Sequence, residues 1–86
     1  GKGDIAGSVV LAAAKPVTAR QLARAAGMAF APATGVTFAP TQDPKLKVRN
    51  GRLVADEPGV YTVKIVVHAR GRRAKVKKIR MYVGAQ

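Results

Sequence analysis

A long alternating segment near the C-terminus, Pro58 to Val83, constrains the fold of this chain most strongly. It reads PGVYTVKIVVHARGRRAKVKKIRMYV, with apolar and polar residues alternating on both sides of an Arg/Gly turn at residues 70–73. A period of two is typical of β-strands, because successive side chains of a strand point to opposite faces. The segment therefore predicts two long strands joined as a hairpin, which the rest of the chain must cover or extend.

The apolar residues of the second predicted strand change parity halfway along. Ala74 and Val76 share one parity, whereas the large apolar residues from Ile79 onward share the other. A β-bulge inserts one extra residue and so re-aims the side chains that follow it. We therefore expect a bulge at Lys77–Lys78, which would turn the large apolar groups of both strands inward.

A short helix is predicted near residues 19–26. Thr18 and Gln21 have the spacing of a capping box, in which the two side chains satisfy each other's backbone amides at the start of a helix. The residues that follow have high helix propensity. We expect this helix to dock on the sheet with Arg20 and Arg24 in solvent, because two turns of helix are not stable alone.

The remaining residues predict short strands. Asn50–Gly51 is the dipeptide preferred in two-residue type I′ hairpin turns. Between residues 28 and 44 four prolines and glycines leave room only for short strands, and we place Phe30 and Phe38 in the core. These strands are expected at residues 5–14, 29–30 and 36–38 and on both sides of Asn50–Gly51.

Length and composition bound the fold and the class of protein. The 86 residues carry a net charge of +12 and include no cysteine. We expect a single domain over residues 1–86, excised from a longer chain because it begins with Gly1. Without cysteine, disulfides, thiolate metal sites and cysteine nucleophiles are excluded. No apolar run reaches the roughly 18 residues of a membrane span, so we expect no transmembrane segment.

No group of residues predicts catalysis, a metal site or a cofactor. His68 is the only histidine, and Ser8 is the only serine and has no base nearby in its segment. The adjacent acids Asp56 and Glu57 lie in a predicted turn, where they are expected to be solvated. The glycines of residues 1–3 lack the strand–loop–helix context of a phosphate-binding loop. We expect a protein that is not an enzyme.

The basic residues of the hairpin are the candidate binding site. If the hairpin closes about Gly71, Lys64 lies near Arg80 and His68 near Lys75, and like charges opposite each other favour a bound anion. The alternative is a solvated face whose lysines discourage edge-to-edge aggregation. The candidate polyanion-binding residues are Lys64, Arg70, Arg72, Arg73, Lys75, Lys77, Lys78 and Arg80.

Three segments together carry a resemblance to a known family. They are TARQLARAAG, NGRLV and the closing PGVYTVKIVVHARGRRAKVKKIRMYV, in which a tyrosine follows the glycine by two residues and the last strand ends in valine. This order resembles the immunoglobulin-like and cadherin-like repeats of bacterial cell-surface proteins. The resemblance implies an all-β immunoglobulin-like β-sandwich of about seven short strands with one short helix. Family members are commonly acidic or neutral, whereas this chain is strongly basic.

The resemblance also implies a function. Such domains act in spacing, adhesion or ligand binding, are strung in tandem and have no catalytic residues. We therefore expect a non-enzymatic module of a bacterial secreted or surface protein, with neighbouring domains of the same chain as partners. An anionic glycan, a wall polymer or nucleic acid is the expected ligand class. The alternative is a small basic nucleic-acid-binding protein of the cytoplasm that uses the hairpin at residues 60–83.

Overall fold

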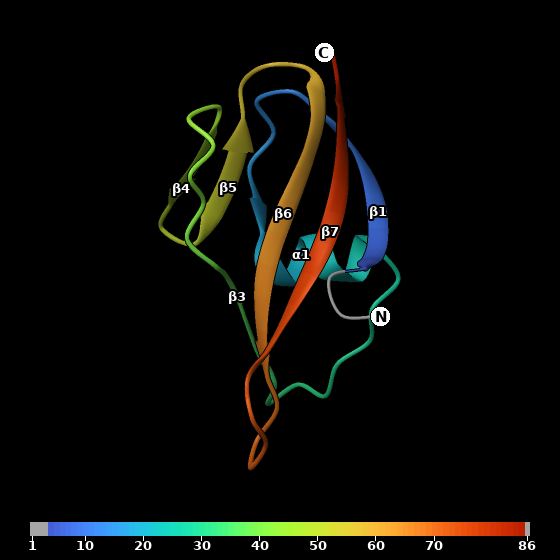
Figure 1. The fold of residues 1–86 in the computed structure, drawn as a ribbon, viewed down its shortest axis with the longest axis vertical. Helices are drawn as coiled ribbons and strands as arrows, with labels where there is room; N and C mark the ends of the chain where they lie inside the picture. Colours follow the sequence, from blue (N-terminus) through green and yellow to red (C-terminus); the bar gives the residue numbers. More distant parts are fainter. Residues whose placement is uncertain (1–3, 86) are drawn as a thin grey trace.

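Two β-sheets and one short helix make up the fold in the computed structural model, which describes residues 4–85 (Figure 1). The GKG segment at residues 1–3 therefore lies outside the described residues, as does residue 86. The expected all-β class is confirmed, with one short helix. The elements are β1 (Ile5–Ala12), β2 (Val17–Thr18), α1 (Ala19–Ala25), β3 (Gly35–Phe38), β4 (Leu46–Arg49), β5 (Arg52–Ala55), β6 (Gly59–His68) and β7 (Lys75–Gly84).

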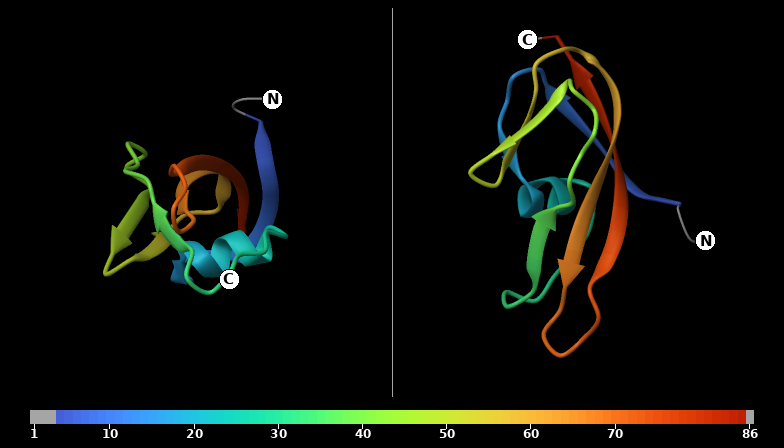
Figure 2. Two further views of the ribbon diagram at one scale, coloured as in Figure 1. Left: turned by 90° about the horizontal axis from the view of Figure 1, so that it is seen from below. Right: turned by 60° about the vertical axis from the view of Figure 1, so that its left-hand side comes forward.

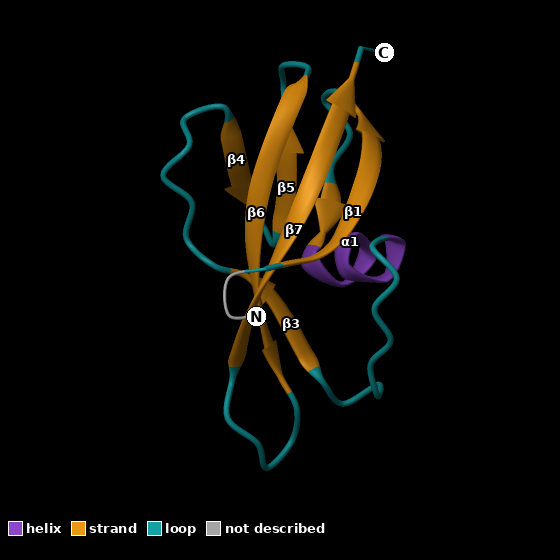
Figure 3. Cartoon of the chain, turned by 45° about the vertical axis from the view of Figure 1, so that its right-hand side comes forward, coloured by secondary structure: helices purple, strands orange, loops and turns teal. Residues whose placement is uncertain are grey.

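The sheet order places the long C-terminal hairpin at the centre of the larger sheet. That sheet has the order β1-β7-β6-β3, and the smaller sheet has the order β2-β5-β4. β1 runs parallel to β7, whereas the other pairs are antiparallel (Figure 3). The chain changes sheets just after β1, where Ala13 still donates to the Gly84 carbonyl and Ala14 donates to the Ala55 carbonyl of β5.

One core lies between the two sheets. Its fully buried large side chains come from the helix and from both sheets. The helix contacts β1, β2 and β3 and covers one side of the core (Figure 2). Phe30 and Phe38, which we placed in the core, are half-buried and pack against its margin. The largest side chains with almost no exposure are Leu22, Leu53, Ile65, Ile79 and Met81.

Two local predictions are confirmed. The amide of Gln21 donates to Thr18 Oγ1 over 3.1 Å, and the amide of Thr18 donates to Gln21 Oε1 over 2.9 Å, so the capping box is present. Asn50 and Gly51 have φ angles of 52° and 73°, the positive values that a type I′ turn requires. Both motifs are local, because each depends on residues within four positions of one another.

Two strand predictions need correction. The first strand ends at Ala12 instead of residue 14, because Ala14 adopts a left-handed φ of 65° where the chain crosses to the other sheet. Residues 29–30 form no strand. The chain there leaves the helix through a hydrogen bond from the Met28 amide to the Ala23 carbonyl, and the Phe30 ring packs against the core and Arg20.

Arg20 is half-buried, contrary to our prediction that it is solvated. Its Nη2 donates to the carbonyl of Thr34, and its guanidinium lies 5.9 Å from the centroid of the Phe30 ring. This side chain therefore ties the helix to the irregular segment before β3. Arg24 is exposed, as expected.

The predicted bulge at Lys77–Lys78 is wrong. The β6–β7 ladder runs without a shift from Gly59 opposite Val83 to Val67 opposite Lys75. Lys77 consequently has the same parity as the buried Ile79, yet it is exposed. It can be exposed because the hairpin extends beyond the smaller sheet, so nothing in that sheet covers this part of β7 (Figure 1).

The uninterrupted register also changes the expected cross-strand pairs. Lys64 lies directly opposite Lys78, and Arg80 lies opposite Thr62, diagonally across the strands from Lys64. His68 lies beyond the last pair of the β6–β7 ladder and pairs with Gly35 of β3 on the other side.

The hydroxyl of Tyr61 ties the start of β6 to the turn before it. This side chain is 5% exposed, and its Oη donates to the Glu57 carbonyl over 2.7 Å. Tyr61→Phe removes this bond and leaves the ring in place, so we expect the free energy of unfolding to fall by about 1 kcal/mol. Urea denaturation measures the change. Tyr82→Phe, at an exposed position, should lie within about 0.5 kcal/mol of the wild type, and an equal loss in both variants would contradict this role of Tyr61.

Candidate polyanion-binding surface

All eight cations of the predicted site lie in the half of the β6–β7 hairpin nearer its turn. We name residues 64–80 the cationic finger; it contains eight Lys and Arg residues and no Asp or Glu. The tip loop and the adjoining start of β7 project along the long axis of the molecule beyond the smaller sheet (Figures 1 and 2). Its five cations in the tip loop and at the start of β7 therefore concentrate positive charge at one end of the protein.

The structure places five of these eight residues at the projecting end and the other three beside the core, so the set does not lie on one face. Lys64, Lys78 and Arg80 lie on the outer face of the larger sheet, because their cross-strand register sets them opposite to the parity of the buried Ile65. Lys75 and Lys77 share the parity of Ile65 and lie on the other side, with their side chains exposed. The tip loop between the strands holds the last three, Arg70, Arg72 and Arg73, all exposed.

Like charges face each other on the outer side of the finger. Lys64 and Lys78 are directly opposed, a pairing that destabilises a sheet. The carboxylates of Asp56 and Glu57 form ion pairs with Lys47 and Lys45, at 3.8 and 3.5 Å, near the smaller sheet. These two acids are thus engaged away from the finger. An anion bound over Lys64 and Lys78 would offset their repulsion.

The outer face of the larger sheet also exposes apolar side chains. Val10, Tyr82 and Val60 form one row across β1, β7 and β6, with 81%, 41% and 62% of their surface exposed. Val76, 60% exposed, lies on the same face within the finger. An apolar row on the face of a sheet is typical of a contact surface.

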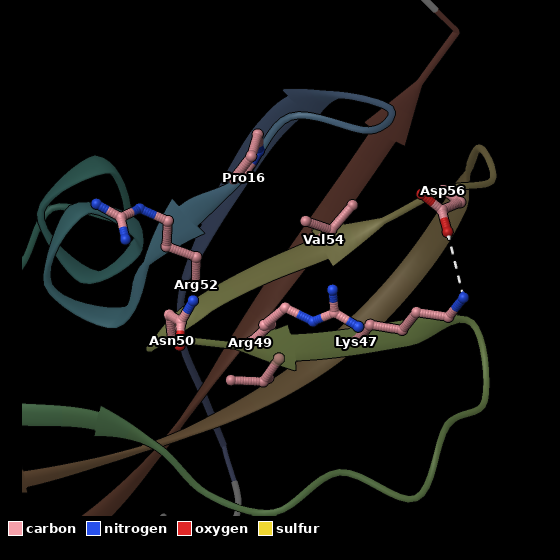
Figure 4. A pocket seen from close by; sticks show the side chains of 8 residues that line it. Pro16, Lys47, Arg49, Asn50, Arg52, Val54 and Asp56 are labelled. Carbon is pink, nitrogen blue, oxygen red and sulfur yellow. Dashed lines mark ion pairs between the residues drawn. The ribbon is translucent and has the colours of Figure 1, made fainter.

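A second cationic cluster lies on the outer face of the smaller sheet, and our sequence reasoning missed it. Arg49 of β4 lies directly opposite Arg52 of β5, and Lys47 lies two residues before Arg49 on the same face. These residues line an open hollow of about 690 Å³ (Figure 4). The signal was present in the sequence, because the Asn50–Gly51 turn sets the register that opposes the two arginines.

The other candidate groups are dispersed. His68 is exposed near the end of β6, and Ser8 is exposed on β1 opposite Arg80. Among residues 4–85, no group of three or more His, Cys, Asp or Glu residues could hold a metal ion. In the same part of the chain, no helix has the length and apolar character needed to cross a membrane.

Comparison with protein-family models, curated proteins and solved structures found no match for this chain.

Proposed function

We propose that this chain is an immunoglobulin-like, non-enzymatic binding module of a bacterial secreted or surface protein. Immunoglobulin constant-type domains have strands A, B, E and D in one sheet and C, F and G in the other. Assigning β2 to β7 in chain order to strands B to G reproduces B, E and D in one sheet and C, F and G in the other. β1 then corresponds to the first strand, although it pairs with β7 instead of β2.

Tyr61 adds independent support for this fold. Immunoglobulin-like domains often carry a tyrosine near the start of strand F whose hydroxyl bonds back to the backbone a few residues upstream. Tyr61 lies near the start of β6, and its hydroxyl donates to the carbonyl of Glu57, four residues earlier. The disulfide and tryptophan of antibody domains have no counterpart here, since the chain contains neither cysteine nor tryptophan.

The proposed activity is binding of an anionic polymer by the cationic finger. The observation that carries this proposal is eight cations and no acid within residues 64–80, five of the cations lying in the projecting tip loop and the start of β7. Because the cations lie on two faces and at the tip, the finger suits a flexible chain that can follow it on more than one side. A wall polymer of phosphodiesters or a sulfated glycan has this character, and a bacterial surface is where an immunoglobulin-like module would meet it.

Nucleic acid is the second candidate ligand, favoured by the ribbon shape of the finger. A two-stranded β-ribbon fits the major groove of DNA, and lysine and arginine contact its phosphates. Single-stranded nucleic acids are usually bound with aromatic side chains that stack on bases. The finger contains no Phe, Tyr or Trp residue, so binding by this route would depend mainly on the phosphate backbone.

The apolar row of Val10, Tyr82 and Val60 supports a second contact, with a neighbouring domain of the same chain. The row lies at the opposite end of the hairpin from the tip of the finger, because these residues pair near the end of β7 and the start of β6. A neighbour docked on the row would leave the tip of the finger free to bind its polymer.

Loss of two tip charges should weaken polymer binding and reduce its dependence on salt. We expect Arg72→Gln with Arg73→Gln to bind poly(glycerol phosphate) about tenfold or more weakly at ~50 mM salt, with a log–log salt slope lower by about 2. The matched control is Lys15→Gln with Arg24→Gln, which removes the same charge from exposed positions outside the finger. Fluorescence anisotropy at several salt concentrations measures both quantities.

Further arms of this experiment separate the ligand classes. Heparin and duplex DNA, titrated under the same conditions, test the sulfated-glycan and nucleic-acid alternatives. Tightest binding to DNA, lost in the finger variant, would favour the second candidate. Equal weakening in the finger and control variants would contradict a site on the finger. Absence of binding to every polymer at ~50 mM salt would contradict polyanion binding altogether, because several phosphate contacts should be strong there.

A further inference from the structure

We propose that the hollow on the outer face of β4 and β5 is a binding site for a single phosphate or sulfate group. It lies on the smaller sheet, away from the cationic finger, and its residues belong to none of the predicted polyanion contacts. The inference can therefore be tested independently of the function proposed for the finger. The residues that line the hollow are Pro16, Lys47, Val48, Arg49, Asn50, Arg52, Val54 and Asp56.

The backbone fixes the two arginines at the hollow. The turn at Asn50–Gly51 joins β4 directly to β5, so Arg49 and Arg52 are the pair next to the turn and face each other across the strands. Their side chains share the outer face with Val54. In Figure 4 the two guanidinium groups point away from each other, Arg49 along β4 toward Lys47 and Arg52 toward the opposite side.

The acid that lines the hollow does not neutralise the arginine pair. The Asp56 carboxylate forms its ion pair with Lys47, whose Nζ lies 3.8 Å from Asp56 Oδ2. This pair lies toward the end of the hollow away from the turn (Figure 4). One lysine charge is thus balanced locally, whereas the charges of Arg49 and Arg52 remain as the excess within the lining.

The lining selects the chemistry of the ligand. Guanidinium groups donate two parallel hydrogen bonds to the oxygens of phosphate or sulfate, and two of them from facing strands can grip one tetrahedral anion. The side-chain amide of Asn50 offers a further donor beside them. Pro16 and Val54 supply apolar walls, on which the organic part of an ester can rest. The site therefore suits a phosphate or sulfate ester more than an isolated carboxylate, which has only two oxygen atoms to accept hydrogen bonds from two guanidinium groups.

The opposed arginines should make the free protein less stable than a neutral variant, and a bound anion should reverse this. Like charges directly across a ladder destabilise it. A ligand that binds only the folded state raises the free energy of unfolding by RT ln(1 + [L]/Kd). The increase therefore becomes marked once the ligand concentration exceeds its Kd. Arg49→Gln should then leave the free protein at least as stable as the wild type and abolish the stabilisation by phosphate.

Thermal unfolding in increasing inorganic phosphate, with ionic strength held constant by chloride, tests the site. We expect the Tm of the wild type to rise with phosphate as one-site linkage requires, and the rise to disappear in Arg49→Gln and in Arg52→Gln. Arg49→Lys keeps the charge but loses the planar fork, so it should bind phosphate about tenfold more weakly. The matched control is Arg24→Gln, which removes one exposed arginine charge outside both the hollow and the finger and should keep the full response.

Several outcomes would overturn this proposal. They are an unchanged Tm of the wild type, or an equal loss of response in Arg49→Gln and Arg24→Gln, which would indicate general screening of the net charge. The finger variant Arg72→Gln with Arg73→Gln should retain the phosphate response, so failure at the finger and failure at the hollow are distinguishable. Glycerol phosphate and poly(glycerol phosphate), titrated in the same way, distinguish a free phosphate ester from a polymer as the source of the group.

Discussion

Replacing Ile79 with alanine is expected to lower the free energy of unfolding by about 2–5 kcal/mol. Ile79 has 0% of its surface exposed and lies in β7, the strand that joins β1 to β6. Its neighbours on the adjacent strands are Val63 of β6 and Gly7 of β1. Truncation of its side chain therefore leaves a cavity in the core beneath these three strands. A domain of this size has a stability of roughly 5–10 kcal/mol, and the variant should therefore be marginally folded.

The matched control for Ile79 lies on the same strand. Val76→Ala removes apolar atoms from a side chain that is 60% exposed, and we expect a change within about 0.5 kcal/mol. Denaturant unfolding of both variants measures the difference. The pair also tests the strand register: with a bulge at Lys77–Lys78, Val76 would face the core together with Ile79. A large loss on truncating Val76 would contradict the uninterrupted ladder.

Replacing Gly7 with alanine is expected to destabilise the protein by about 1–3 kcal/mol through overpacking. A Cβ atom at this position would lie 2.4 Å from the carbonyl oxygen of Ala26 and 2.9 Å from its Cβ. Real Cβ atoms do not approach a backbone oxygen so closely, and the residue after the helix must therefore move. The expected result is a weaker contact between β1 and the C-terminal end of α1.

Gly84→Ala is the control for Gly7, because it adds the same methyl group near the end of β7. Nothing lies within 4 Å of a Cβ built there. We expect the Gly84 variant to be as stable as the wild type within about 0.5 kcal/mol. Thermal and denaturant unfolding of the two variants would measure the contrast, and wild-type stability of Gly7→Ala would show that the helix does not pack closely on β1.

Local chemistry made much of the fold predictable from the sequence. The capping box of Thr18 and Gln21 and the positive φ angles of Asn50–Gly51 depend on neighbours within four residues. The two long strands follow from an alternation that spans about ten residues each, as β6 and β7 do. Such signals need no knowledge of which elements pack together.

The predictions that were wrong concern features that depend on tertiary packing. We inferred a bulge from the parity change near Lys77 because we assumed that the whole hairpin is covered by a second layer. The smaller sheet ends short of the tip, and a lysine with inward parity is exposed there. The contact of Gly7 with Ala26 and the bond from Arg20 to Thr34 likewise join residues that are 14 or more positions apart. These features depend on tertiary packing, which alternation alone does not specify.

The candidate sites were likewise predictable from the sequence only in part. The charge excess of the finger could be read from the sequence, whereas its distribution over two faces and a tip follows from the register of β6 and β7. The arginine pair of the hollow could have been deduced from the turn that opposes Arg49 and Arg52. The same register places Val54 beside them, whereas Pro16 lies before β2 and its position at the hollow required the structure.

The measurement that tests the proposed function most directly is a residue-by-residue map of polymer binding. Backbone amide shifts of the isotope-labelled protein would be followed by NMR while poly(glycerol phosphate) is added at ~50 mM salt. We predict that the largest changes fall within residues 64–80 and are lost when Arg72 and Arg73 are replaced by glutamine. Amide shifts in residues 64–80 that stay unchanged while the polymer binds elsewhere would contradict the assignment of the cationic finger as the binding site.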